Sequence, residues 1–210
     1  IGCIPAAVVG LLLNDWVQDT LYTAQVVAAM LIVYGIVFIV MERRNRRREA
    51  KLNAAIPRGR HVRASEHASD SLFDINSVDE IDVPHALRIG LFQCLAIVPG
   101  TSRSGATIIG GMLTGCSRVA ATEFTFFLAI PVMLGWGLVQ MFRFFAKGLV
   151  MSQTEVWILV VGMVTAFLVS IVSIKFLMNY IKRNDFTAFG VYRIVLGIIV
   201  LGYFGLQALV

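Results

Sequence analysis

The stretch PGTSRSGAT, residues 99–107, decides the fold of this chain. It divides the apolar runs 87–98 and 108–113, which would otherwise form one hydrophobic segment. Pro99 and Gly100 are residue types that readily end a helix. The same nine residues place hydroxyl groups and a single arginine, Arg103, between the two apolar runs. A charged side chain between two apolar runs is energetically costly, so the presence of Arg103 requires an explanation from the rest of the sequence.

The composition is that of a membrane protein with one long polar segment. Of the 210 residues, 58% are hydrophobic and 15% are charged, whereas soluble domains carry about 25% charged residues. Residues 42–85 hold nine of the eighteen Lys and Arg and eight of the thirteen Asp and Glu. The remainder of the chain is therefore almost free of charge.

The net charge of +5 does not indicate a nucleic-acid-binding protein. Six basic residues lie in MERRNRRREAK, residues 41–51, directly after an apolar run. Positive charge beside a spanning helix is typical of the cytoplasmic side of a membrane. We interpret 42–85 as a cytoplasmic polar loop. The alternative for its basic end is a surface that binds lipid headgroups or a partner.

Five apolar runs predict membrane-spanning helices. Four reach the length of about 20 residues that a span requires, namely 22–41, 119–145, 155–180 and 188–210. The first run, 1–13, is too short to cross about 30 Å of hydrocarbon, and we expect it to be the clipped remainder of a span. The predicted fold is an all-α polytopic membrane protein whose single transmembrane domain covers 1–210.

The segment 86–115 does not fit as a sixth span. Each of its two apolar pieces is too short to cross a membrane alone, and PGTSRSG joins them. Counting it as one crossing would start the run 119–145 on the wrong side. A re-entrant helical hairpin, which enters from the cytoplasmic side and turns at depth, restores the topology. Irregular backbone at that depth must be buried in protein or line a polar cavity, so we expect the turn to line a cavity.

The chemistry of the turn suits phosphate. We expect a second half-helix to begin near Ser102–Ser104 with a serine as its N-cap, which leaves backbone N–H groups free and partial positive charge at the turn. Arg103 adds a full positive charge and a planar fork of donors. Further hydrogen-bonding groups come from the hydroxyls of Thr101, Ser102, Ser104 and Thr107. On a helix one small, polar face collects Ser104, Thr107, Gly111 and Thr114.

Other interpretations of the motif are weaker. Arg103 could extend to a membrane interface, yet an arginine at mid-membrane costs about 2.5–3.5 kcal/mol even on the most lenient scale, and such residues are usually functional. The stretch nearly matches a Walker A loop, but its lysine is absent and no strand precedes it. The acidic patch 74–82 lacks the spacing of an EF-hand. The three cysteines and three histidines form no metal-binding motif.

Three further polar residues lie in apolar segments. Gln93 stands six residues before the turn, and Glu123 lies early in the run 119–145. Both are candidates to support the site from behind the residues that contact a ligand, or to bond across helices. For Arg193, in VYRIVLG, we expect an interface anchor or a pairing between helices.

The region FQCLAIVPGTSRSGATIIGGMLTGCSRVAATEFTFFLAIP, residues 92–131, resembles the signature region of the bacterial undecaprenyl-diphosphate phosphatase family. The family motif PGxSRSxxT is matched at Pro99, Gly100, Ser102, Arg103, Ser104 and Thr107. Further similarity occurs in IPAAVVGLL, residues 4–12, and in YRIVLG, residues 192–197.

The resemblance implies a multi-pass enzyme of the bacterial inner membrane. Its members remove the terminal phosphate of undecaprenyl diphosphate, which recycles the lipid carrier for cell-wall synthesis. They have spanning helices and two re-entrant hairpins in inverted repeats, with a site that faces outward. The resemblance implies that Arg103 is catalytic and holds the diphosphate. It also implies that phosphate contacts come from Gly100, Thr101, Ser102, Ser104 and Thr107.

The resemblance also implies groups that this chain lacks. The family's second, glutamate-rich motif has no match here, so we expect an N-terminal span and hairpin to be missing. A divalent cation, Mg²⁺ or Ca²⁺, would be bound mainly by carboxylates of that part, and the attacking group would come from it. The 210 residues alone should therefore hydrolyse nothing.

A transporter or flippase for a phosphorylated lipid or an anion is the alternative. Broken helices that point at an anion also occur in transporters, so the hairpin alone does not distinguish the two. A glutamate pair with serine and histidine in the missing part would favour hydrolysis.

Overall fold

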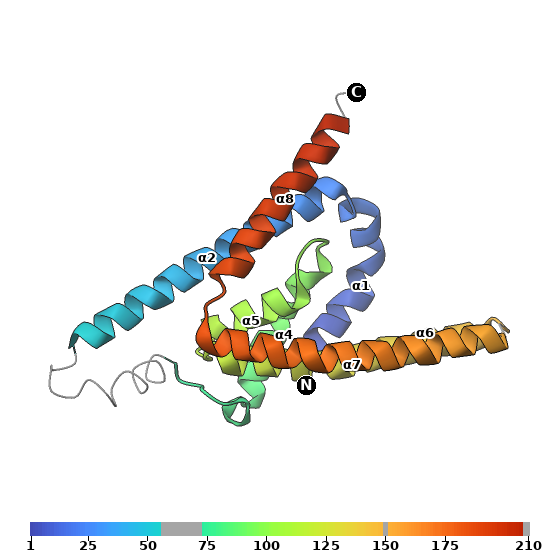
Figure 1. The fold of residues 1–210 in the computed structure, drawn as a ribbon, viewed down its shortest axis with the longest axis horizontal. Helices are drawn as coiled ribbons and strands as arrows, with labels where there is room; N and C mark the ends of the chain where they lie inside the picture. The colour runs from blue at the N-terminus through green and yellow to red at the C-terminus, as the bar shows by residue number, and fades with distance from the viewer. Residues whose placement is uncertain (56–72, 149–150, 208–210) are drawn as a thin grey trace. The chain divides into compact units, whose positions relative to one another are not determined.

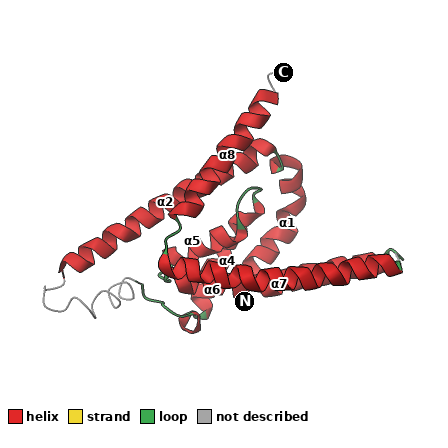
Figure 2. Cartoon of the chain, viewed as in Figure 1, coloured by secondary structure: helices red, strands yellow, loops and turns green. Residues whose placement is uncertain are grey.

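The chain is α-helical wherever the structure describes it. The structure is a computed structural model that describes residues 1–55, 73–148 and 151–207. Its helices (Figure 1) are α1 (Ile4–Leu21), α2 (Ala24–Ala55), α4 (Val83–Cys94), α5 (Arg103–Leu113), α6 (Arg118–Ala146), α7 (Gln153–Arg183) and α8 (Thr187–Gln207), with short 3₁₀ turns η1 (Val78–Glu80) and η2 (Leu95–Ile97). Within these ranges Figure 2 shows no strand, and one isolated bridge joins Ile75 to Cys116. The predicted all-α class is confirmed.

Four helices are long and apolar enough to cross a membrane. They cover Ala24–Arg48, Arg118–Ala146, Gln153–Lys182 and Thr187–Gln207. These match the four full-length spans that the sequence predicts. The apolar part of α1 is the shorter piece Ile4–Leu13, so its assignment as a clipped span stays a prediction.

Part of the predicted polar loop is helical. The sequence predicts loop from residue 42 onward, but α2 continues without a break to Ala55. The reason is local: the stretch from Glu42 to Ala55 contains no proline or glycine and is rich in Arg, Glu, Lys and Ala, which favour helix. A change from apolar to charged sequence therefore marked the end of a span and not the end of a helix. Most of the remaining loop, 56–72, lies outside the described residues.

The chain forms two compact units. One comprises Ile1–Leu128 with Asp185–Val210, and the other is Ala129–Asn184. The second unit holds the later part of α6 and α7, whose apolar side chains are mostly exposed. This is the pattern of helices that face lipid. The hairpin of α4 and α5 lies in the first unit, together with α1, α2 and α8.

Close approach of backbones joins α2 to α8, which lie side by side in Figure 1. A Cβ atom added at Gly35 would lie 2.7 Å from the Gly190 carbonyl oxygen, and one added at Gly197 would lie 2.9 Å from that of Ala28. Because no side chain fits at these points, glycine lets the two helices pack at backbone distance.

Close contacts at glycine also pack the hairpin of α4 and α5. A Cβ atom at Gly110 would lie 2.6 Å from the Phe92 side chain on α4, and one at Gly111 would lie 2.8 Å from Ala121 on α6. Glycine at both positions therefore permits close contacts between helices. Together they fix α5 between its hairpin partner and the first turns of α6.

A buried carboxylate ties three elements together near the charged part of α2. Glu42 is 1% exposed. Its carboxylate accepts the Arg118 Nε–H at 3.1 Å and pairs with Nη2 at 2.9 Å. The Phe186 N–H donates to the same carboxylate at 3.3 Å. The beginnings of α6 and α8 are therefore held against α2.

Asp185 adds an ion pair beside this carboxylate. It pairs with Arg46 of α2 and accepts two hydrogen bonds from Thr187. Partial burial alone would raise the pKa of Asp185, but the Thr187 hydrogen bonds and the Arg46 charge outweigh it and lower the pKa. The carboxylate is therefore ionised at neutral pH.

The glycine contact between α2 and α8 predicts a position-dependent effect of one methyl group. Gly197→Ala should lower the free energy of unfolding by about 1–3 kcal/mol, since the Ala28 carbonyl cannot move away cheaply. Gly202→Ala on the same helix is the matched control, because nothing lies within 4 Å of the added carbon. It should be neutral or stabilising by up to about 1 kcal/mol. Thermal unfolding in detergent measures both, and equal melting temperatures would contradict the close contact.

Candidate active site

Pro99 and Gly100 build the turn that joins the two halves of the hairpin. The Thr101 N–H donates to the Val98 carbonyl at 3.1 Å and closes a four-residue turn. Gly100 has a φ of +86°, which is the value that the third position of a type II turn requires, while proline suits the second. The dipeptide therefore ends the first half of the hairpin and reverses the chain before α5.

Ser102 caps α5, and the predicted N-cap is confirmed. Its hydroxyl accepts the Gly105 N–H at 3.1 Å and lies 3.1 Å from the Ser104 hydroxyl. Its carbonyl accepts the Ala106 N–H at 2.9 Å, the first bond of the helix. The N–H groups of Arg103 and Ser104 have no hydrogen-bond partner in the described part of the chain. They are free to bind an anion at the positive end of the helix.

Arg103 is the charge at this helix end. Its side chain is exposed, as is that of Ser104. The guanidinium makes no hydrogen bond or ion pair with any residue in 1–55, 73–148 or 151–207. Five N–H donors are therefore available beside two free backbone N–H groups. This set is what a phosphate requires, since its oxygens accept hydrogen bonds and carry negative charge.

Thr107 is buried between α5 and α6, and its contact with phosphate stays a prediction. It is 2% exposed, and its hydroxyl donates within its own helix to the carbonyls of Arg103 and Ser104 at 3.0 and 3.1 Å. The Thr125 hydroxyl of α6 lies 2.9 Å away and donates to it. With these partners the hydroxyl holds α5 to α6 and does not face outward beside Arg103. Helical spacing places residues on a face but does not say what covers that face.

Gly100 contacts α2, and the Thr101 hydroxyl beside it is buried. A Cβ atom at Gly100 would lie 2.5 Å from the Val27 carbonyl oxygen and 2.7 Å from its Cα, so the turn sits directly on the backbone of α2. The Thr101 hydroxyl has no hydrogen-bond partner among the described residues. A direct contact of either residue with phosphate stays a prediction.

Gln93 and Glu123, the two candidates to support the site, lie in different surroundings. Gln93 is 6% exposed in the last turn of α4, and its side-chain oxygen has no hydrogen-bond partner among the described residues. Glu123 is half-buried on α6, and no hydrogen bond or ion pair connects it to the turn within the part of the chain that the structure describes. A role for either in the site stays a prediction.

Arg193 and Tyr34 are contacts of the turn that the sequence did not reveal. Arg193 of α8 donates from Nη2 to the Gly100 carbonyl at 2.8 Å. Its guanidinium carbon lies 5.8 Å from the centroid of the Tyr34 ring. The expected interhelix role of Arg193 is correct in kind, but its partner is the turn. The only sequence signal was the presence of a charge in an apolar helix.

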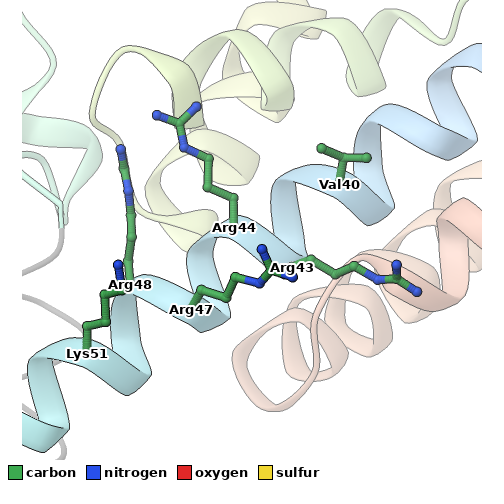
Figure 3. A pocket seen from close by; sticks show the side chains of 6 residues that line it. All are labelled: Val40, Arg43, Arg44, Arg47, Arg48 and Lys51. Carbon is green, nitrogen blue, oxygen red and sulfur yellow. The ribbon is translucent and has the colours of Figure 1, made fainter.

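A second concentration of positive charge lies on the charged part of α2. A hollow of about 380 Å³ is lined by Val40, Arg43, Arg44, Arg47, Arg48 and Lys51, whose side chains Figure 3 shows. The side chains extend from one helix in different directions and do not converge on a point. No residue of the turn lines this hollow. It is therefore separate from the site at α5.

The donors at the turn suit an anion and do not suit a metal ion. The turn presents N–H groups, a guanidinium and neutral hydroxyls, whereas Mg²⁺ and Ca²⁺ prefer carboxylate and carbonyl oxygens. Among the described residues no three His, Cys, Asp or Glu lie close enough together to hold a metal. The divalent cation implied by the resemblance finds no ligand set here.

The chain is similar to known proteins along nearly its whole length. The family model described as "Bacitracin resistance protein BacA" matches residues 1–199. The chain belongs to the BacA family. It is 45% identical over 203 residues to a protein of Enterococcus faecalis, covering 97% of this chain and 65% of that protein. It is 47% identical over 211 residues to one of Desulfitobacterium hafniense, covering 100% of this chain and 66% of the relative. It is also 48% identical over 203 residues to one of Streptococcus thermophilus, covering 97% and 62%.

These BacA relatives are each named undecaprenyl-diphosphatase. The chain spans about two thirds of their length, between 62% and 66% in the three proteins compared. The matches cover 97–100% of this chain, so they extend over the segments that form the hairpin and most of the other helices.

The cap of α5 predicts that substitutions of Ser102 and Ser104 have different effects on stability. Ser102→Ala should lower the free energy of unfolding by about 1 kcal/mol, whereas Ser104→Ala should change it by less than about 0.5 kcal/mol. Ser102→Asp should restore stability, because aspartate also caps helices, but should weaken binding of inorganic pyrophosphate through charge repulsion. Unfolding in detergent and titration calorimetry measure the two effects. An equal loss of stability in both alanine variants would contradict the cap.

Proposed function

We propose that the protein hydrolyses undecaprenyl diphosphate to undecaprenyl phosphate and inorganic phosphate, and that this chain supplies the phosphate-binding half of the site. The observation that carries the proposal is the free end of α5, where the unpaired guanidinium of Arg103 stands beside two free N–H groups. The names of the relatives support the lipid diphosphate as the substrate and favour hydrolysis over the transporter alternative.

Each residue at the end of α5 has a defined part in this proposal. Arg103 is the catalytic residue, and its planar fork binds two phosphate oxygens at once. The N–H groups of Arg103 and Ser104 and the hydroxyl of Ser104 bind further oxygens. Ser102 caps the helix and, with Thr101, borders the phosphate. Thr107 and Gly100 act by fixing the position of α5 and of the turn.

The proposed chemistry is the cleavage of a phosphoric anhydride. In the net reaction, the oxygen of water forms a bond to the terminal phosphorus, the anhydride P–O bond breaks, and undecaprenyl phosphate leaves with that electron pair. One proton of the water is released to solvent, and the other stays on the inorganic phosphate. Negative charge grows on the departing oxygen, while the charge of the terminal phosphoryl group is spread over its three equatorial oxygens. Arg103 and the helix N–H groups stabilise this charge, because they are fixed before the reaction begins.

The attacking group and the cation belong to a different part of the protein in this proposal. Among the described residues the turn has no histidine or carboxylate hydrogen-bonded to it. We propose that the base or nucleophile, and the carboxylates for Mg²⁺ or Ca²⁺, come from outside the residues described, and no step above depends on the cation.

The proposed placement is the bacterial inner membrane. The multi-pass architecture and the family assignment support a membrane enzyme. The arginine-rich part of α2 favours a cytoplasmic location for 42–85 under the positive-inside rule. The hairpin would then enter from the cytoplasmic side and present Arg103 toward the outer face, where the lipid diphosphate is released during cell-wall synthesis.

Phosphate release by the full-length protein tests the role of Arg103. Arg103→Ala should lower kcat/KM by about 10²–10³-fold, as for the loss of one charge-stabilising donor. Arg103→Lys should recover part of the activity, since it keeps the charge but loses the two-point fork. Arg88→Ala is the matched control, because Arg88 is an exposed arginine of the same hairpin. Full activity of Arg103→Ala would refute the assignment.

The isolated 210 residues test the division of the site. They should bind inorganic pyrophosphate but release no phosphate from undecaprenyl diphosphate, because the attacking group is supplied elsewhere. Turnover by the isolated chain would show that the group lies within it.

A further inference from the structure

The charge of Arg193 lies against the turn and not against an acid. Its Nη2 atom donates to the Gly100 carbonyl at 2.8 Å. No ion pair joins it to a carboxylate within the described ranges. Its Nε atom is buried and has no partner there. An arginine in an apolar helix normally marks a function, and here its one hydrogen bond within the described residues goes to the backbone of the turn before α5.

The turn is held from two sides. On one side Gly100 lies on the backbone of Val27 at a distance that excludes even a methyl group. On the other side Arg193 binds the carbonyl of the same residue. Tyr34 of α2 supports the Arg193 side chain, because its ring lies under the guanidinium. The glycine contacts between α2 and α8 set the distance across which Arg193 reaches.

The contacts of Val27 and Arg193 with Gly100 control the direction of the phosphate-binding groups. The Gly100 carbonyl belongs to the peptide plane that joins Gly100 to Thr101, only one residue before the N-cap Ser102. A rotation of that plane would turn Thr101 and then redirect the free N–H groups of Arg103 and Ser104. Donors stabilise developing charge only when they already point to one place.

We propose that Arg193 is a positioning residue for the phosphate-binding end of α5, and that Tyr34 holds its guanidinium in place. Arg193 acts through the Gly100 carbonyl and does not contact the substrate. The proposal rests on the proposed function for its catalytic consequence. Its structural part, the ordering of the turn, is independent of the substrate.

Steady-state kinetics of the full-length protein test the catalytic consequence. Arg193→Gln should lower kcat by about tenfold or more and change KM by less than about threefold, since Arg103 still binds the diphosphate. Arg193→Lys should restore most of kcat, because an ammonium can also donate to the Gly100 carbonyl. Tyr34→Phe keeps the ring and should remain near wild type, whereas Tyr34→Leu should resemble Arg193→Gln. If Arg193→Gln and Tyr34→Leu lowered only the melting temperature and left kcat per folded molecule unchanged, the proposal would be overturned.

Hydrogen–deuterium exchange separates this inference from the proposed function. In Arg193→Gln the hydrogen-bonded amides of Thr101 and Gly105 should exchange at least about tenfold faster, while the remainder of α8 keeps its protection. This readout needs no activity, so absence of phosphate release by the wild type would refute the function alone. Unchanged exchange at both amides, or equally faster exchange along all of α8, would refute the positioning role.

Discussion

A helix that breaks in apolar surroundings must find partners for the backbone groups that it exposes, and the turn at Pro99 and Gly100 shows how this chain meets that constraint. The turn satisfies one carbonyl internally through Thr101 and another through Arg193. Ser102 satisfies an N–H of the following helix. The N–H groups of Arg103 and Ser104 at the start of α5 have no partner among the described residues. The break in the helix therefore exposes donors that can bind an anion.

This arrangement depends on backbone contacts elsewhere in the first unit. Glycines at 35, 190 and 197 bring α2 and α8 together, and Gly100 places the turn on α2. If larger residues separated α2 from α8, the side chain of Arg193 would not reach the Gly100 carbonyl without pulling the turn off Val27. The carboxylate of Glu42 holds the beginnings of α6 and α8 against the same helix. The geometry at the turn is thus set by close packing and one buried carboxylate that lie outside the motif.

The sequence predicted what depends on local chemistry. The four long spans follow from apolar length, the turn follows from Pro99 and Gly100, and the cap follows from Ser102. Errors arose where a residue's partner is distant in the chain. Thr107 has the spacing of a cavity-facing residue, yet Thr125 of α6 covers it. The charged part of α2 was taken for a loop, because polarity was used in place of helix propensity. The partner of Arg193 lies 93 positions away, and no local pattern encodes such a pairing.

Arg103 and Arg193 divide between them two tasks that one arginine cannot perform. A residue that binds phosphate must keep its donors free and accessible, and this leaves it unable to order the backbone that carries it. A residue that orders the backbone must use its donors to bind protein carbonyls, and it must lie within the protein. Arg103 is exposed and unpaired within the described chain, whereas Arg193 is bonded to the Gly100 carbonyl beneath the turn. Because Arg193 has no carboxylate partner in that part of the chain, its charge also adds to the positive potential at the start of α5. The arginine at 193 therefore serves both the geometry of the turn and the binding of an anion.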